Sequence, residues 1–250
     1  MWFTTFLIKP LYNVFVYLIG VMPGGDVGFA LIVMTVAVRV IFYPAYTSSI
    51  KTQMGMAAVQ GELDEINEKY KDEPTEKAQR IMALYKERNI KPFSSFIAVL
   101  APIPIFIALY YSIAREGLPH IDTKLLYSFV HVPAVVNVEF LGFLNLLAAH
   151  NIPLAVIVAF LQYLVVRLSV TRTKKATTAK PVAADKAQAQ ALQQNLMLYA
   201  LPILYVFIVY SLPAVAGLYF GVSNLISVGQ ELLIKRQLAK QSNQNIATQA

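Results

Sequence analysis

The stretch GFALIVMTVAVRVIFYPAY, residues 28–46, decides the fold class of this chain. It has the length and apolar character of a transmembrane helix, yet its twelfth residue is an arginine, Arg39. An arginine near the middle of such a helix costs roughly 2.5–3.5 kcal/mol on insertion scales. Two explanations stay open at this point. Either the charge faces a wet cavity or a partner inside the membrane, or the long side chain snorkels toward the headgroups.

The composition is that of a polytopic membrane protein. Hydrophobic residues make up 57% of the chain, charged residues only 14%, and the mean hydropathy is +0.54. Four more apolar stretches are candidates for membrane spans, namely 93–113, 152–170, 196–211 and 214–234. Because proline disfavours helical continuation, residues 211–213 are expected to divide the last two stretches into a helical hairpin.

The distribution of basic residues predicts the topology. With five spans and the N-terminus outside, sixteen Lys and Arg residues fall on the cytoplasmic side and three on the external side. A sixth span within 125–149 would move the basic loop 171–195 outside and break this rule, and that segment carries Pro133 and Glu139. We therefore predict an all-α protein of one domain, residues 1–250, with five transmembrane helices and a cytoplasmic C-terminus.

The two external segments contain no predicted span. Residues 1–24 are expected to form an amphipathic helix in the membrane interface, with Trp2, Tyr12 and Tyr17 near the headgroups, and a cleaved signal peptide is the alternative. Residues 115–151 are external and contain three histidines without the spacing of a metal site. Because the chain lacks an Arg- and Ser-rich transit peptide, a bacterial plasma (inner) membrane is favoured.

The segment 50–91 is predicted to be a cytoplasmic helical hairpin. Apolar residues recur at heptad spacing before a turn at residues 71–74, and a second apolar stripe follows it. The first stripe is Met56, Val59, Leu63, Ile66 and Tyr70, and the second is Ala78, Ile81, Met82 and Tyr85. The hairpin is either a solvated spacer or a docking element for partners and incoming chains.

The other cytoplasmic segments show no apolar period. Residues 171–195 are rich in Ala, Thr, Gln and Lys and are predicted to be a flexible loop. Residues 235–250 form the cytoplasmic tail.

Polar side chains form one stripe on each of three predicted spans. On a helical wheel, the stripe of span 214–234 opposes a face of Ala, Val, Leu and Ile. Polar residues that avoid lipid must face one another or water, either as hydrogen bonds between packed helices or as the lining of a hydrated groove. No acid lies deep in a span to neutralise Arg39, which favours a groove that receives an anionic group. The predicted groove residues are Thr35, Arg39, Tyr43, Gln162, Tyr219, Phe220, Ser223, Asn224 and Ser227.

The sequence offers no basis for bond-making catalysis. There is no cysteine, no nucleophile motif, no Gly-rich phosphate loop and no HExxH motif. We therefore predict no enzyme activity, no metal and no cofactor.

Four ordered motifs resemble the YidC/Oxa/Alb family of membrane protein insertases. They are VRVIFYP around Arg39, ELDEINEKYKDEPTEKAQRIMALYKERNIKP at 62–92, PIPIFIALYYSI at 102–113 and LPAVAGLYFGVSNLISVGQELLIKR at 212–236. One departure is Phe220, which stands where the family commonly has tryptophan.

The resemblance implies five helices around a hydrophilic groove that is open to the cytoplasm and to lipid. It also implies the insertion and folding of membrane proteins without nucleotide hydrolysis. The implied partners are nascent membrane proteins and the lipid bilayer, while a Sec-type translocon and the ribosome are left open, and DNA is not a partner. The alternatives are a small anion transporter or channel, with Arg39 as the selectivity charge, and a structural assembly scaffold.

Overall fold

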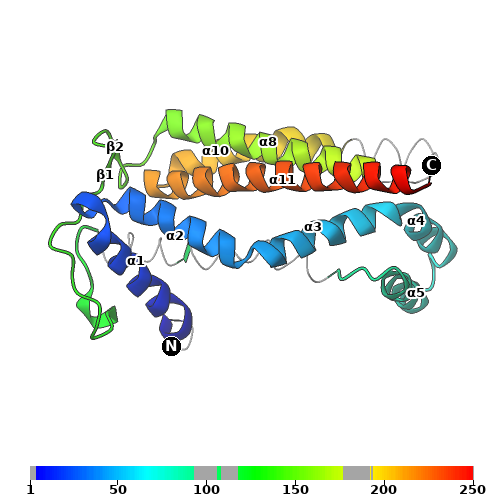
Figure 1. Ribbon diagram of the computed structural model, residues 1–250, viewed down its shortest axis with the longest axis horizontal. Helices are drawn as coiled ribbons and strands as arrows, with labels where there is room; N and C mark the ends of the chain where they lie inside the picture. Colours follow the sequence, from blue (N-terminus) through cyan, green and yellow to red (C-terminus); the bar gives the residue numbers. More distant parts are fainter. Residues whose placement is uncertain (1–3, 93–105, 108–117, 177–191, 193, 250) are drawn as a thin grey trace. The chain divides into compact units, whose positions relative to one another are not determined.

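The computed structural model describes residues 4–92, 106–107, 118–176, 192 and 194–249 (Figure 1). These residues are mostly helical and include one short two-stranded sheet. The chain divides into two compact units by its internal contacts. Unit 1 comprises residues 1–41, 100–164 and 201–229, and unit 2 comprises residues 42–99, 165–200 and 230–250.

Unit 1 is built from helices at both ends of the sequence. Its elements are η1 (Thr4–Ile8), α1 (Lys9–Val21), η2 (Pro23–Gly25), α2 (Val27–Ile41), η3 (Thr123–Leu125), the first part of α8 (Ile152–Ala176), α10 (Leu201–Ser211) and the first part of α11 (Ala214–Gln249). Helix α2 starts at a side-chain cap, because Oδ1 of Asp26 accepts hydrogen bonds from the backbone N–H groups of Gly28 at 2.7 Å and Phe29 at 3.0 Å.

The predicted span 28–46 is not one continuous helix. Helix α2 ends at Ile41, and α3 (Tyr43–Ala58) begins directly after Phe42, with proline in its first turn. Proline removes a backbone donor, and its ring clashes with the carbonyl group four residues earlier, so a straight helix through Pro44 is disfavoured. The apolar stretch is thus divided between two helices.

The structure supports fewer spans by length than the sequence predicts. Among the described residues, one helix, Ile152–Lys174, is long and apolar enough to cross a membrane, and α2 with α3 would make a second if they form one broken span. The stretch 196–211 is a shorter apolar run, made of η4 (Leu196–Ala200) and α10. The predicted span 93–113 lies outside the described residues apart from Phe106 and Ile107.

Helix α1 buries one face in unit 1. Tyr12, which the sequence places near the headgroups, is only 1% exposed, and its hydroxyl accepts a hydrogen bond from the backbone N–H of Asp122 at 2.8 Å. A distant segment of the chain therefore covers this face of the helix, which the sequence does not predict. Tyr17 is 58% exposed, and Trp2 lies outside the described residues.

A buried asparagine fastens α1 to the segment after residue 118. Nδ2 of Asn13 donates to the carbonyl oxygens of Lys9 at 2.7 Å and Leu125 at 2.8 Å, and its Oδ1 accepts from the backbone N–H of Tyr127 at 2.6 Å. An unpaired amide at this 3% exposed position would cost about 1–3 kcal/mol, so these bonds hold the segment in place.

The region 115–151 contains a short hairpin that the sequence does not predict. Strands β1 (Glu139–Phe140) and β2 (Leu144–Asn145) are antiparallel, with Phe140 opposite Leu144. The ring of Phe140 packs edge-on against Phe29 at 5.2 Å between centroids and covers Gly28 at the start of α2. Two-residue strands leave too short an alternating pattern to be recognised in the sequence.

Replacing Gly28 by alanine is expected to destabilise unit 1 by about 1–3 kcal/mol. A Cβ atom at this position would overlap the ring of Phe140, which is itself buried. Gly229 is the matched control, because a Cβ there meets no atom within 4 Å, and alanine in a helix is neutral or favourable. Thermal unfolding in detergent should show a lower Tm for Gly28→Ala alone, and equal Tm values would contradict the packing.

Unit 2 contains the predicted hairpin helices. Helices α4 (Gln60–Lys69) and α5 (Pro74–Glu87) pack against each other after α3 (Figure 1). Their shared core consists of Val59, Leu63, Leu84 and Ile90, with Met56, Ile66, Ile81 and Tyr85 packed around it. Most of the predicted stripes are in this core, but Met82 is 51% exposed and Leu84 takes the buried position instead.

Polar contacts supplement the hairpin core. The guanidinium of Arg88 on the α5 side pairs with Glu62 of α4 at 2.8 Å. Tyr70, predicted in the apolar stripe, instead packs under the cations of Lys69 and Arg80, at 5.5 and 5.6 Å from its ring centroid. Partial burial raises the pKa of the Tyr85 hydroxyl above its ordinary value, because desolvation disfavours the charged phenolate.

The predicted flexible loop 171–195 begins as a helix. Helix α8 continues to Ala176, and residues 177–191 and 193 lie outside the described residues. The hydroxyl groups of Thr171 and Thr173 donate to the carbonyl oxygens four residues earlier, at 2.8 and 2.9 Å. These polar residues therefore extend the helix without an apolar period that the sequence could reveal.

Candidate functional site

Arg39 lies in the last turn of α2 and is half-buried. Its charge acts on the hydroxyl groups of Tyr205 and Tyr219 in the same unit. No carboxylate in the described part of the chain pairs with it. A half-buried cation among hydroxyl groups is stabilised by an anion or by water, so this position can receive a carboxylate or another anionic group.

A cation in the last turn also interacts favourably with the helix dipole. This contribution is typically about 0.3–1 kcal/mol. The cost of placing an arginine near the centre of a span is roughly 2.5–3.5 kcal/mol. The helix dipole alone therefore does not offset the cost of inserting Arg39. Other polar groups or water must also stabilise its charge.

The predicted stripe of α11 faces the interior of unit 1. Asn224 donates from Nδ2 to the carbonyl oxygen of Val158 on α8 at 3.5 Å, and the Ser227 hydroxyl donates to the carbonyl oxygen of Ser223 at 2.9 Å. The first bond joins α11 to α8, and the second satisfies the Ser227 hydroxyl within α11. The buried members of the stripe are Tyr219, Ser223, Asn224 and Ser227, and Phe220 is half-buried.

Ser223 lies in the buried part of this stripe and is 4% exposed. Its side chain interacts with the Tyr219 hydroxyl one turn earlier. A hydroxyl has one donor and two acceptor positions, so Ser223 retains capacity for a further hydrogen bond. Water or a polar group of a bound molecule is expected to satisfy it.

Phe220 belongs to an aromatic cluster rather than to the polar stripe alone. Its ring stacks on Phe106 at 5.5 Å between centroids and meets Tyr205 edge-on at 5.7 Å. Tyr219 is 5.4 Å away on the other side of the same helix turn. These contacts give an apolar wall close to the tyrosines on which the charge of Arg39 acts.

The remaining predicted groove residues differ in their surroundings. Thr35 is fully buried, and its hydroxyl donates to the carbonyl oxygen of Leu31 at 2.7 Å, so it presents no free polar group. Gln162 on α8 is half-buried. Tyr43 is the first residue of α3, directly after the helix break at Phe42, and belongs to unit 2.

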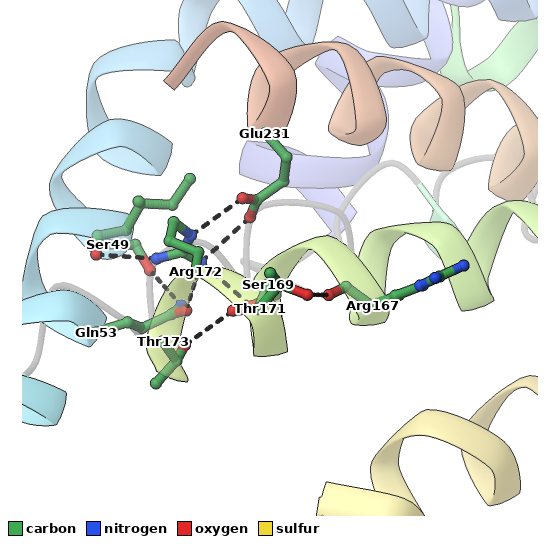
Figure 2. Close-up of polar contacts among 9 residues, drawn as sticks. Ser49, Gln53, Arg167, Ser169, Thr171, Arg172, Thr173 and Glu231 are labelled. Atoms are coloured by element: carbon green, nitrogen blue, oxygen red, sulfur yellow. Dashed lines mark hydrogen bonds and ion pairs between the residues drawn. The ribbon is translucent and has the colours of Figure 1, made fainter. Parts of the chain in front are cut away.

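Sequence reasoning missed a buried ion pair in unit 2. The Arg172 side chain is 7% exposed and that of Glu231 is 4% exposed (Figure 2). Nε of Arg172 donates to Oε2 of Glu231 at 3.0 Å, and Nη2 donates to Oε1 at 3.2 Å. The partners are 59 residues apart, and Arg172 stands in a stretch of Thr and Lys, so no local pattern reveals the pair.

Metal binding has no support in the described ranges. No three His, Asp or Glu side chains gather there closely enough to hold a metal ion.

Comparison with known proteins identifies the family of this chain. The profile of the 60Kd inner membrane protein family matches residues 19–241, nearly the whole sequence. The chain belongs to this family. Its resemblance to the YidC/Oxa group is thereby confirmed, and the family places the chain at the bacterial plasma (inner) membrane.

Several curated relatives carry the name membrane protein insertase YidC. The chain is 31% identical over 221 residues to the protein of Clostridium tetani, covering 88% of this chain and 86% of that one. It is 26% identical over 237 residues to the protein of Haemophilus influenzae and 25% identical over 240 residues to that of Cupriavidus taiwanensis, in each case covering 94% of this chain. It spans only 38% and 36% of the length of these two longer relatives.

Proposed function

We propose that this chain is a membrane protein insertase that inserts nascent membrane proteins and helps them fold, without nucleotide hydrolysis. The observation that carries the proposal is a half-buried Arg39 without a carboxylate partner among the described residues, in a chain of this family. An enzyme would need a reactive group, whereas an insertase needs a polar path into the membrane and an apolar exit.

The proposed architecture has five spans around a hydrophilic groove, with the N-terminus outside and the C-terminus in the cytoplasm. The distribution of Lys and Arg supports this topology. The groove is open to the cytoplasm and to lipid, and Arg39, Gln162 and Ser223 are its polar contacts. Thr35 is proposed to act at its margin, since its hydroxyl already donates to the carbonyl oxygen of Leu31.

In the proposed mechanism, Arg39 attracts the acidic tail or polar flank of a substrate. Water in the groove stabilises this polar segment, so the stretch of hydrocarbon that it must cross becomes shorter. The aromatic wall around Phe220 guides the apolar segment toward lipid. Burial of that segment in the bilayer supplies the driving force, at about 0.8 kcal/mol for each CH₂ group.

Reconstitution in liposomes tests the proposal. Purified protein should insert a small membrane protein with an acidic external tail at a rate well above that of empty liposomes. Anion flux without insertion would instead favour a transporter, and neither activity would favour a scaffold. Adding a Sec-type translocon to the same liposomes, or presenting the substrate on ribosomes, measures whether either partner is required.

Water in the groove is a separate prediction. The chain has no native cysteine, so single cysteines at Gln162 and Ser223 can be labelled selectively. Both should react with a membrane-impermeant maleimide added from the cytoplasmic side, because the thiolate forms only where water is present. Leu225 is the control: it is 60% exposed in the described structure but lies off the polar stripe and is expected to face lipid. Equal labelling at all three positions would reject the groove.

A further inference from the structure

Arg172 contacts a third helix besides its pair with Glu231. Its Nη1 donates to the carbonyl oxygen of Ile50 at 3.4 Å, and its Nη2 donates to Oε1 of Gln53 at 3.2 Å (Figure 2). Ile50 and Gln53 lie on α3, Arg172 on α8 and Glu231 on α11. One guanidinium group therefore joins three helices within unit 2.

Helix α3 is the root of the cytoplasmic hairpin. It runs directly into α4, and the hydroxyl of Thr52 donates to the carbonyl oxygen of Lys91 at 3.3 Å, where the chain returns from α5. Both ends of the hairpin thus meet at the segment of α3 that Arg172 holds. A side chain that holds this segment of α3 in one orientation therefore also determines the direction in which the α4–α5 hairpin extends.

The chemistry of the contact is directional. Apolar packing is non-directional and tolerates rotation and sliding of a helix, whereas a planar guanidinium with a bidentate carboxylate allows one geometry. Glu231 neutralises and orients Arg172, and the remaining N–H groups reach α3. Burying Arg172 and Glu231 costs desolvation free energy that an apolar contact would avoid. An apolar contact, however, could not fix the orientation of α3 as the guanidinium group does.

We propose that Arg172 is a positioning residue for insertion, which clamps α3 to α8 and α11 and so fixes the direction of the α4–α5 hairpin. The clamp, defined as Ile50, Gln53, Arg172 and Glu231, rests on the proposed insertase function for its role in activity. Helices α8 and α11 also carry Gln162 and Ser223, so the clamp connects the hairpin root to the helices that bear groove residues.

Gln53→Ala is the sharpest test, because it removes a contact with α3 and leaves the ion pair intact. Loss of one hydrogen bond to a buried cation is expected to slow insertion about fivefold. Gln60→Ala is the matched control, since the side chain of Gln60 donates to Asp64 on its own helix and forms no hydrogen bond with α8 or α11 among the described residues. Spin labels on Asn67→Cys and Lys235→Cys report the direction of the hairpin, and their distance distribution should broaden in Gln53→Ala alone. An unchanged distribution together with a normal insertion rate would overturn the clamp.

Charge exchange separates positioning from simple stability. Arg172→Glu and Glu231→Arg should each lower resistance to proteolysis, because each leaves two like charges buried together. The double exchange restores a pair, but a glutamate at position 172 cannot donate to Ile50 or Gln53. It should therefore regain protease resistance while the spin-label distances stay broad and insertion stays slow. Full recovery of all three readouts would show that the pair only stabilises the fold.

The two proposals can fail separately. If the wild-type protein inserts no substrate in liposomes, the proposed function fails. The spin-label distances still show whether the clamp fixes the direction of the hairpin. If the wild-type protein inserts substrates and Gln53→Ala does so equally well with unchanged distances, the clamp alone fails.

Discussion

Arg39→Ala is expected to slow the insertion of substrates with acidic external tails by about a hundredfold. Two unit charges roughly 5 Å apart attract each other by about 3 kcal/mol at an effective dielectric constant near 20, which corresponds to this change in rate. Arg39→Glu should be worse, since it repels the same tails. Arg39→Lys keeps the cation and should retain much of the activity unless the contact needs the planar guanidinium fork. Insertion rates in liposomes, measured for each variant, check these values.

The substrate provides an internal control for this prediction. Removing Asp and Glu from the external tail of the substrate should reduce the difference between wild type and Arg39→Ala, because the attraction depends on both charges. Arg167→Ala is the matched protein control, since Arg167 lies in a predicted span and its side chain is exposed. If Arg39→Ala inserted acidic-tailed substrates at the wild-type rate, the electrostatic mechanism would be rejected.

The size of the effect also separates attraction from a structural role of Arg39. If the guanidinium only complements the dipole of α2, its loss costs about 0.3–1 kcal/mol, or at most a few-fold in rate. Such a loss would also be the same for acidic and neutral tails. A hundredfold effect confined to acidic tails is therefore outside the range of the dipole explanation.

Composition, charge bias and motifs were enough to predict the helical class, the family and the helical hairpin elements. These features rest on patterns within one segment, such as the heptad spacing that puts Val59 and Leu63 in the hairpin core. The break at Phe42 was also visible in principle, because Pro44 stands inside the apolar stretch. The helical wheel nevertheless treated 28–46 as one uninterrupted helix, whereas the structure has two helices, α2 and α3, over this stretch.

Features that depend on distant partners could not be predicted from local patterns. Tyr12 carries the signature of an interfacial aromatic residue, but a segment more than a hundred residues later covers it. Arg172 has the surroundings of a soluble linker, and only the contact with Glu231 reveals its burial. In both cases the partner is far away in sequence, so propensity and periodicity carry no information about the pairing.

Replacing residues 61–88 by a short Gly-Ser linker is expected to abolish insertion while leaving unit 1 folded. The linker removes α4 and α5 and keeps Gln53 and the clamp. The physical reason is that the hairpin has a core of its own, so its loss should not expose the core of unit 1. Insertion in liposomes and the protease resistance of unit 1 are the two measurements. Full activity of this variant would reduce the hairpin to a spacer.

Point variants show whether the folded hairpin or merely its surface charge is needed. Leu63→Ala with Leu84→Ala should unfold the hairpin, because truncating a buried leucine costs about 2–5 kcal/mol, and these are two of its four buried core residues. This pair should therefore reproduce the loss of insertion. Glu76→Ala removes an exposed ion pair with Arg80 on α5, worth about 0.3–0.5 kcal/mol, and leaves Arg80 over the Tyr70 ring, so it should change the rate less than about threefold. If loss of the exposed pair slowed insertion more than loss of the two leucines, partners would recognise the surface charge of the hairpin rather than its folded shape.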